Sequence, residues 1–164
     1  TRYSDTPRMP FLARLHPDLV RISPPWHTFE ETVAGLAETL VAARELSGDA
    51  ARTAVHAVTM RELEASTASL DIHAGVPHAR LPGLTRAAVA LGISLSGLYE
   101  AVPTVPIQIV ALVLSPPDAR TAQLETLADI ATLLRSSELR AALLAAPDGR
   151  TALAALHRHA RPMF

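Results

Sequence analysis

Three apolar segments in the middle of the chain constrain the fold more than any other feature of the sequence. They read "AGVPHA" (74–79), "RAAVALGISL" (86–95) and "PIQIVALVLS" (106–115), and glycine or proline bounds them. Their richness in valine and isoleucine is typical of strands covered on both faces, because a strand with one face in water alternates apolar and polar residues. The segments therefore predict a sheet with helices on both sides.

Helical patterns precede these segments. Residues 19–23 alternate well enough for a short strand, which a pair of prolines would end. Thr28 and Glu31 then have the spacing of a capping box, and the apolar residues that follow predict a helix over 29–46. A second helix is expected to begin at a cap provided by Asp49.

The helical period returns after the last apolar segment. The residues expected on the buried face of the next helix are Leu124, Leu127, Ala131 and Leu134. Ser137 is expected to open another helix, and Asp148 to cap a last one. The order of one strand, two helices, three strands and further helices predicts an α/β fold, a three-layer α/β/α sandwich.

Length and composition fit a single domain. The chain has 164 residues, 49% of them apolar, which is enough for a substantial core. The first residues are polar and interrupted by proline, so we expect 1–18 to be an N-terminal tail or linker and 19–160 to form the domain. Because the chain starts at Thr1 and not at a methionine, we expect it to be trimmed or to be a piece of a longer protein.

The charged residues and the missing residue types exclude several classes of function. Fifteen basic and sixteen acidic side chains give a formal charge of −1, which argues against a nucleic-acid partner or an anionic membrane surface. The sequence contains no lysine, so a lysine Schiff base is excluded, and no cysteine, so thiolate chemistry is excluded. The longest apolar runs reach about ten residues where a membrane span needs about twenty, so membrane insertion is not expected.

The histidines do not predict a metal site. His73 and His78 are five residues apart, and His157 and His159 are two apart. Neither spacing places two ligands one helical turn apart, and no carboxylate is placed to complete a set. The glycine-rich signatures of nucleotide-binding loops are also missing from the sequence, so no cofactor is expected.

His78 is the strongest candidate for chemistry. Pro77 fixes φ and has no N–H, so the strand should end there and the imidazole can project from its end. A neutral imidazole is a good nucleophile near neutral pH, and a phosphoryl group on it would add about two negative charges that need donors nearby. The candidate donors are Arg61, Arg80, Ser66 and Thr67.

Two other interpretations of His78 stay open on the residues alone. A histidine whose polar atoms are simply satisfied at a strand end has the same local sequence. A hydrolase could be assembled from Ser66, Asp71 and His78, although no G-x-S-x-G segment is present to position the serine.

A series of motifs along the chain favours the interpretation of His78 as a reactive residue. In chain order they are Arg61–Glu62, Ser66–Thr67, "GVPHARLPGL", "AAVALGISLSGL", "PIQIVALVLSPP" and "AQLETLADIATLL". The series, from about residue 19 to 156, resembles the type-2 EIIA domains of the sugar phosphotransferase system. These are the fructose/mannitol-type EIIA domains and the PtsN-like nitrogen-regulatory proteins. The resemblance implies their three-layer sandwich, with a mixed sheet of about five strands.

The resemblance also implies a function. In this family the histidine after the proline receives a phosphoryl group from the carrier protein HPr, or from a paralogue. It passes the group to a cysteine of an EIIB partner or serves as a signal to a regulated protein. Carried over by position, His78 is the phosphoryl acceptor and Arg61 stabilises the phosphoryl group. The resemblance implies a cytoplasmic protein that needs no cofactor.

The chain departs from the family pattern near His78. The turn "STASLDIHAG" is one residue longer than usual and lacks its early glycines, so we expect a loop of its own shape. Where the family often has a second histidine, this chain has Gln123, which can donate an N–H but carries no charge. These departures leave an alternative open, an EIIA-like regulatory or binding module, possibly part of a larger transporter or regulator, that no longer transfers phosphate.

Overall fold

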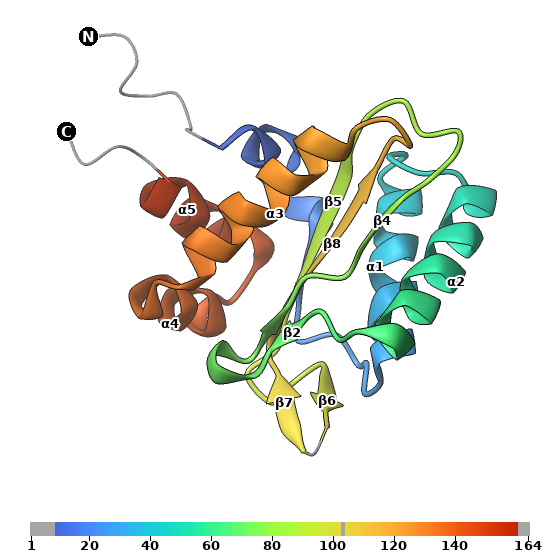
Figure 1. The fold of residues 1–164 in the computed structure, drawn as a ribbon. Helices are drawn as coiled ribbons and strands as arrows, with labels where there is room; N and C mark the ends of the chain where they lie inside the picture. The colour runs from blue at the N-terminus through green and yellow to red at the C-terminus, as the bar shows by residue number, and fades with distance from the viewer. Residues whose placement is uncertain (1–8, 103, 161–164) are drawn as a thin grey trace, which may run out of the picture.

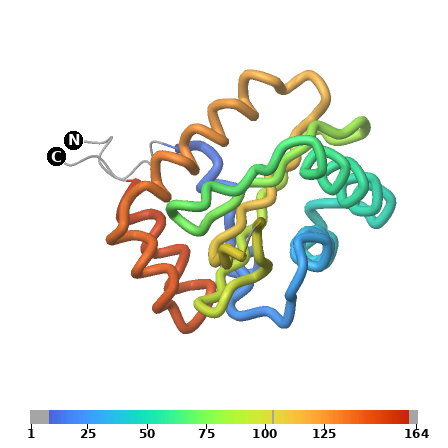
Figure 2. Tube along the Cα trace, turned by 60° about the horizontal axis from the view of Figure 1, so that its bottom comes forward, coloured from blue at the N-terminus to red at the C-terminus, as the bar shows by residue number. Residues whose placement is uncertain are grey.

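The computed structural model describes residues 9–102 and 104–160 (Figure 1). A sheet lies between α1 and α2 on one side and α3, α4 and α5 on the other, which confirms the predicted three-layer sandwich (Figures 1 and 2). The helices are α1 (Phe29–Ala42), α2 (Gly48–Glu64), α3 (Arg120–Leu134), α4 (Ser137–Ala145) and α5 (Gly149–Ala160). Three short 3-10 helices are η1 (Pro10–Arg14), η2 (Pro17–Leu19) and η3 (Leu70–Ile72).

The sheet is mixed, and within the described residues it has six strands. They are β1 (Val20–Ile22), β2 (Ala68–Ser69), β3 (Ala74–Gly75), β4 (His78–Arg80), β5 (Ala88–Ile93) and β8 (Ile109–Ser115). Their order is β1-β5-β8-β3-β2, and β4 also pairs with β8. β5 and β8 are antiparallel, whereas β1 runs parallel to β5, and β3 and β4 run parallel to β8. A separate hairpin joins β6 (Tyr99–Ala101) to β7 (Val105–Ile107).

The central strands β5 and β8 are covered on both faces, as their apolar segments predicted. Every residue of β5 and of β8 is buried. Val89, Leu91 and Ala111 face α3, α4 and α5, where they line a small apolar space together with residues of those helices. Gly92 faces the opposite side, since a Cβ at this position would lie 3.4 Å from the Trp26 ring and 3.6 Å from Leu36 of α1.

The N-terminal segment differs from the predicted tail. Phe11, Leu12 and Leu15 are buried in the same core as the sheet, so residues 9–18 pack on the domain instead of standing away from it. Half of the residues in 9–18 are apolar, and most of these side chains provide the packing. Residues 1–8 of the predicted tail lie outside the described part of the chain.

The start of α1 agrees with the prediction, whereas the end of α1 and the cap of α2 differ from it. Thr28 caps α1 as predicted, because its hydroxyl accepts the Glu31 N–H at 3.0 Å. α1 ends at Ala42 and not near residue 46, and Arg44 takes a left-handed conformation with φ of 63°. Ser47, not Asp49, caps α2, with its hydroxyl 3.1 Å from the Ala50 nitrogen.

The C-terminal helices follow the predicted order. Ser136 caps α4, one residue before the predicted start, and Asp148 caps α5 as predicted, accepting the Thr151 N–H at 2.8 Å. The buried face of α3 is turned by about one residue from the prediction, because Gln123 is buried and Leu124 is exposed. In the described part of the chain, no helix is both long and apolar enough to cross a bilayer.

Candidate functional site

His78 lies at the start of β4, directly after a break in the sheet edge. β3 ends at Gly75, as the proline predicted, but the chain pairs with β8 again from His78 onwards. The carbonyl of Pro77 accepts the Val113 N–H at 3.0 Å, which anchors the break to the central strand. Pro77 therefore interrupts the strand and does not terminate it. After the interruption, the pairing of β4 with β8 holds the backbone of His78.

The imidazole of His78 is half-buried and has one defined hydrogen bond. Its Nδ1 lies 2.8 Å from the carbonyl oxygen of Val76. A carbonyl oxygen only accepts, so Nδ1 must carry the hydrogen of this bond. In the neutral ring the lone pair then resides on Nε2. The backbone thus selects the tautomer in which Nε2 is the nucleophile.

Gln123 lies over the strand pair that carries His78. In the parallel register His78 pairs with Val113 and Arg80 pairs with Ser115, so these side chains project on the side of α3. Gln123, in the first turn of α3, is buried and donates to the Ser115 hydroxyl at 3.4 Å. The predicted site residue is thus near the strand of His78, and Ser115, which the sequence analysis missed, is its partner.

Ser66 and Thr67 are brought together by Glu62. Both hydroxyls donate to the Glu62 carboxylate, at 3.0 Å from Ser66 and 2.8 Å from Thr67. The Thr67 N–H also donates to Glu62, at 3.1 Å. The sequence analysis included Glu62 in a motif but assigned it no role, and its spacing to two following hydroxyl residues is the signal that could have done so.

The two predicted arginines differ in their surroundings. Arg61 lies in the last turn of α2 and is exposed, and its guanidinium has no hydrogen bond or ion pair within the described residues. Arg80 donates to the Pro117 carbonyl at 2.8 Å, which ties β4 to the loop before α3. Neither guanidinium is bonded to His78 in the described structure. Arg61 has its donors free for a ligand.

The long turn before His78 contains one residue in a left-handed conformation. After η3, His73 takes a left-handed φ of 55°, where a glycine would be unstrained. Four hydrogen bonds hold it there, the first from its own N–H to the Leu70 carbonyl at 3.4 Å. Its Nδ1 lies 2.9 Å from the Pro106 carbonyl, and its own carbonyl accepts the N–H groups of Gln108 and Ile109 at 2.7 and 3.3 Å. This histidine is therefore part of the scaffold.

The hydrolase alternative does not match these contacts. Ser66 donates to Glu62, and the Nδ1 of His78 faces the Val76 carbonyl and not a carboxylate. Residues 9–102 and 104–160 also contain no cluster of three or more His, Asp or Glu side chains that could hold a metal ion.

The hydroxyl of Tyr99 is buried beneath the turn. It has no hydrogen-bond partner in the described structure, and the ring packs edge-on against Phe29 with centroids 5.2 Å apart. Burial, and secondly the charge of Glu62, raise the pKa of this phenol well above its ordinary value. Tyr99 is thus an uncharged support that lies close to Glu62.

Gly75 is the residue that makes room for this hydroxyl. A Cβ at position 75 would lie 3.0 Å from the Tyr99 oxygen. We expect Gly75→Ala to destabilise the protein by about 1–2 kcal/mol, and the cost to vanish when Tyr99→Phe removes the oxygen. A double-mutant cycle by urea unfolding measures this coupling; equal costs of Gly75→Ala in both backgrounds would contradict it.

Comparison with known proteins identifies the family. A family model described as phosphoenolpyruvate-dependent sugar phosphotransferase system, EIIA 2, matches residues 14–159. No protein with a curated description matches the sequence. The chain is similar in structure to the nitrogen regulatory protein IIA-Ntr from Neisseria meningitidis, with 20% identity, a TM-score of 0.77, and coverage of 89% of this chain and 98% of that one.

Two structures from Escherichia coli are also similar. One is IIA mannitol, with 16% identity, a TM-score of 0.70, and coverage of 87% of this chain and 98% of that one. The other is a complex of mannitol enzyme IIA with phosphorylated enzyme IIB, with 15% identity, a TM-score of 0.67, and coverage of 87% and 96%. At these identities the likeness shows the fold, and the matched family model carries the assignment. The resemblance deduced from the motifs is confirmed: the chain belongs to the type-2 EIIA family of the phosphoenolpyruvate-dependent sugar phosphotransferase system.

Proposed function

We propose that this chain is a cytoplasmic phosphocarrier that accepts a phosphoryl group on Nε2 of His78 from an HPr-like protein. It then passes the group to the cysteine of an EIIB partner or uses it as a signal to a regulated protein. The observation that carries the proposal is the 2.8 Å contact from Nδ1 to the Val76 carbonyl, which leaves the Nε2 lone pair free. Membership of the family supports the same role.

The transfer balances without any further reactant. The Nε2 lone pair attacks phosphorus, the P–N bond to the donor histidine breaks, and the donor ring takes back its electron pair. The phosphorylated ring of His78 keeps its hydrogen on Nδ1 and becomes cationic, a charge that the Val76 carbonyl stabilises. In the second transfer the EIIB thiolate attacks phosphorus, and the same electron pair returns to Nε2.

We assign the phosphoryl oxygens to Arg61 first. Its guanidinium is exposed and unpaired in the described structure, and such a group can bind two oxygens of one phosphoryl group. Gln123 is a second donor, because its 3.4 Å bond to Ser115 is long and easily exchanged. Arg80 uses one of its five N–H donors on the Pro117 carbonyl and can offer another. Ser66 and Thr67 each have one hydroxyl donor, which Glu62 already holds, so their hydroxyls can contribute only by leaving Glu62.

The surroundings of β4 suit a protein partner. Figure 1 shows β4 beside β8 at the edge of the sheet, with α2 on one side of this layer and α3 on the other. Both helices carry exposed apolar side chains, Leu63 on α2 and Leu124 on α3, which are 77% and 57% exposed. The similar mannitol enzyme IIA forms a complex with phosphorylated enzyme IIB. We therefore assign this side to the HPr-like donor and the EIIB acceptor.

A reconstituted phosphorelay tests the proposal. The chain is incubated with Enzyme I, HPr and phosphoenolpyruvate, and its mass is followed before and after acid treatment. We expect an acid-labile gain of one phosphoryl group, because phosphohistidine hydrolyses in acid, and its loss when an EIIB protein is added. No gain with HPr or with its nitrogen-branch paralogue would contradict the proposal and favour a module that does not transfer phosphate.

A further inference from the structure

Within the described part of the chain, the Glu62 carboxylate is bonded only to the turn that follows its own helix. Its two carboxylate oxygens accept the Ser66 hydroxyl at 3.0 Å, the Thr67 hydroxyl at 2.8 Å and the Thr67 N–H at 3.1 Å. A carboxylate holding three donors fixes their relative positions more firmly than neutral acceptors would. The end of α2 is thereby locked to the start of β2.

The same turn is hydrogen-bonded to Val76, the residue whose carbonyl orients His78. The carbonyl of Thr67 accepts the Val76 N–H at 3.2 Å, and the adjacent Ala68 pairs with Gly75 across the β2–β3 hairpin. The Val76 carbonyl then accepts Nδ1–H of His78 at 2.8 Å. A continuous path of short contacts thus runs from the Glu62 carboxylate through the Thr67 and Val76 backbone to the imidazole.

Val76 is held from two sides. Its N–H donates to the Thr67 carbonyl of the hairpin, and the next carbonyl, that of Pro77, accepts the Val113 N–H of β8 at 3.0 Å. Pro77 offers no N–H, so the hairpin supplies the contact on the side of Thr67 and Glu62. The Glu62 charge also acts on Tyr99, whose hydroxyl lies next to Gly75, because it contributes to the raised pKa of that phenol. A displaced hairpin would move the carbonyl away from Nδ1.

We infer that Glu62 is a positioning residue for the phosphoryl transfer: through Thr67 and Val76 it holds His78 in the tautomer whose Nε2 is free to attack. The expected effect of Glu62 on the rate of phosphoryl transfer rests on the proposed function. Its structural part, the control of the tautomer, concerns the unphosphorylated protein. Glu62 does not touch the phosphoryl group, and its negative charge, bound by three donors, would only repel that group at close range.

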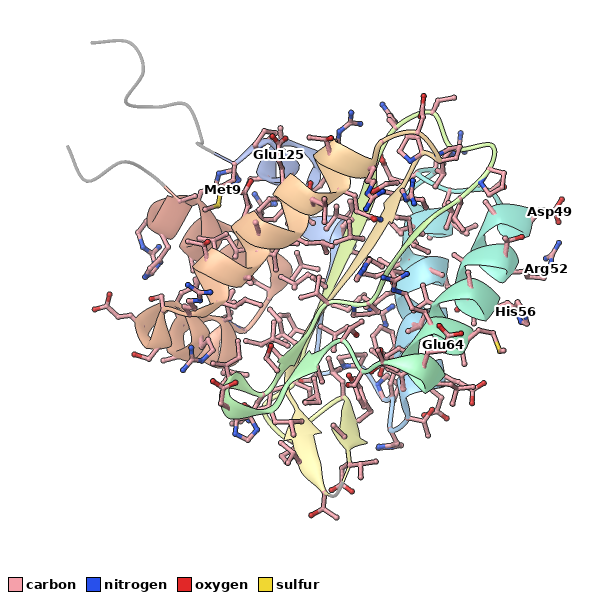
Figure 3. All side chains as sticks on the ribbon, viewed as in Figure 1. Met9, Asp49, Arg52, His56, Glu64 and Glu125 are labelled. Atoms are coloured by element: carbon pink, nitrogen blue, oxygen red, sulfur yellow. The ribbon has the colours of Figure 1, made fainter. Side chains whose placement is uncertain are left out.

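The test compares Glu62→Ala, Glu62→Gln and the control Glu64→Ala. Glu64 is exposed and lies two residues further along α2, and its carboxylate has no hydrogen bond or ion pair within the described residues (Figure 3). Nitrogen-15 NMR of the imidazole reports the tautomer, and the phosphorelay gives the rate. We expect the parent and Glu64→Ala to show His78 protonated on Nδ1, and Glu62→Ala to show a mixture of both tautomers with a rate about tenfold lower.

Glutamine supplies the rescue that a positioning role requires. Its carbonyl oxygen can accept the Thr67 N–H, and the two hydroxyls can rotate to accept from its amide. Glu62→Gln should therefore restore the Nδ1–H tautomer and most of the rate. Should Glu62→Ala fail to fold, Thr67→Val removes one of the bonds and should shift the tautomer in the same direction by less.

Two results would overturn the inference. One is an unchanged tautomer in Glu62→Ala, whatever happens to the rate, since a fall in rate alone would mark a direct role or a lost partner contact. The other is a mixed tautomer in Glu62→Gln equal to that in Glu62→Ala. Because the NMR measurement needs no phosphoryl donor, a parent protein that takes up no phosphate would contradict the proposed function and leave this test decisive.

Discussion

His78→Ala abolishes phosphoryl uptake. The substitution removes the only atom that our account allows to form the P–N bond, so we expect the rate in the phosphorelay to fall by at least about a thousand-fold. The fold should be retained, because the ring is half-buried and lies at the start of a short strand at the edge of the sheet. Mass spectrometry before and after acid treatment measures the loss.

His56→Ala is the matched control for this variant. His56 is an exposed histidine on α2, outside the contacts around His78, and its position is labelled in Figure 3. We expect His56→Ala to take up one phosphoryl group at the parent rate. Undiminished uptake in His78→Ala would show that another histidine is the acceptor, and the account of this site would then be wrong.

Arg61→Ala slows phosphorylation by about a hundred-fold, because it removes the cation that we assign to the phosphoryl oxygens and that stabilises charge as the phosphoryl group moves. Arg61→Lys should restore only part of the rate, since an ammonium is a point charge and cannot bind two oxygens as a planar guanidinium does. Because Arg61 is exposed at the end of α2, we expect Arg61→Ala to unfold at the same temperature as the parent. Thermal unfolding beside the kinetics checks this.

Arg52→Ala controls for the general charge of α2. Arg52 lies on the same helix, is exposed and pairs with Asp49 (Figure 3). It should leave the rate unchanged at moderate salt, where charges more than about 10 Å apart are largely screened. An equal effect of Arg52→Ala and Arg61→Ala would mean that the helix attracts the donor protein by its charge and that Arg61 has no specific role.

The layers of the fold could be predicted from the sequence because the signals were local. The apolar segments correspond to β5 and β8, whose residues are buried on both faces of the sheet. The caps at Thr28 and Asp148 were predicted from residue type and spacing alone, and both form the expected bonds. Such signals depend on neighbours within one turn of chain.

What could not be predicted depends on distant contacts. The buried face of α3 includes Gln123, and periodicity alone assigns a polar residue to the solvent side. Only the structure supplies its partner, Ser115, which lies across the layers at the end of β8. β2 is likewise too short to show a pattern, and pairing with β3 defines it.

The same distinction applies to the site. The motifs pointed to His78 and Arg61, but the tautomer of the imidazole follows from a carbonyl two residues earlier, whose position depends on Thr67 and Glu62. Ser66 and Thr67 were predicted as phosphate donors from their hydroxyls. In the structure those hydroxyls belong first to Glu62, so any direct contact with phosphate remains a prediction.

The phosphohistidine isomer tests the central claim most directly. After phosphorylation in the relay, nitrogen-15 and phosphorus-31 NMR identify which ring nitrogen of His78 bears phosphorus. Because Nδ1–H is bonded to the Val76 carbonyl at 2.8 Å, we predict phosphorus on Nε2 alone, with the Nδ1 hydrogen still present. Phosphorus on Nδ1, or on any other histidine, would contradict the account.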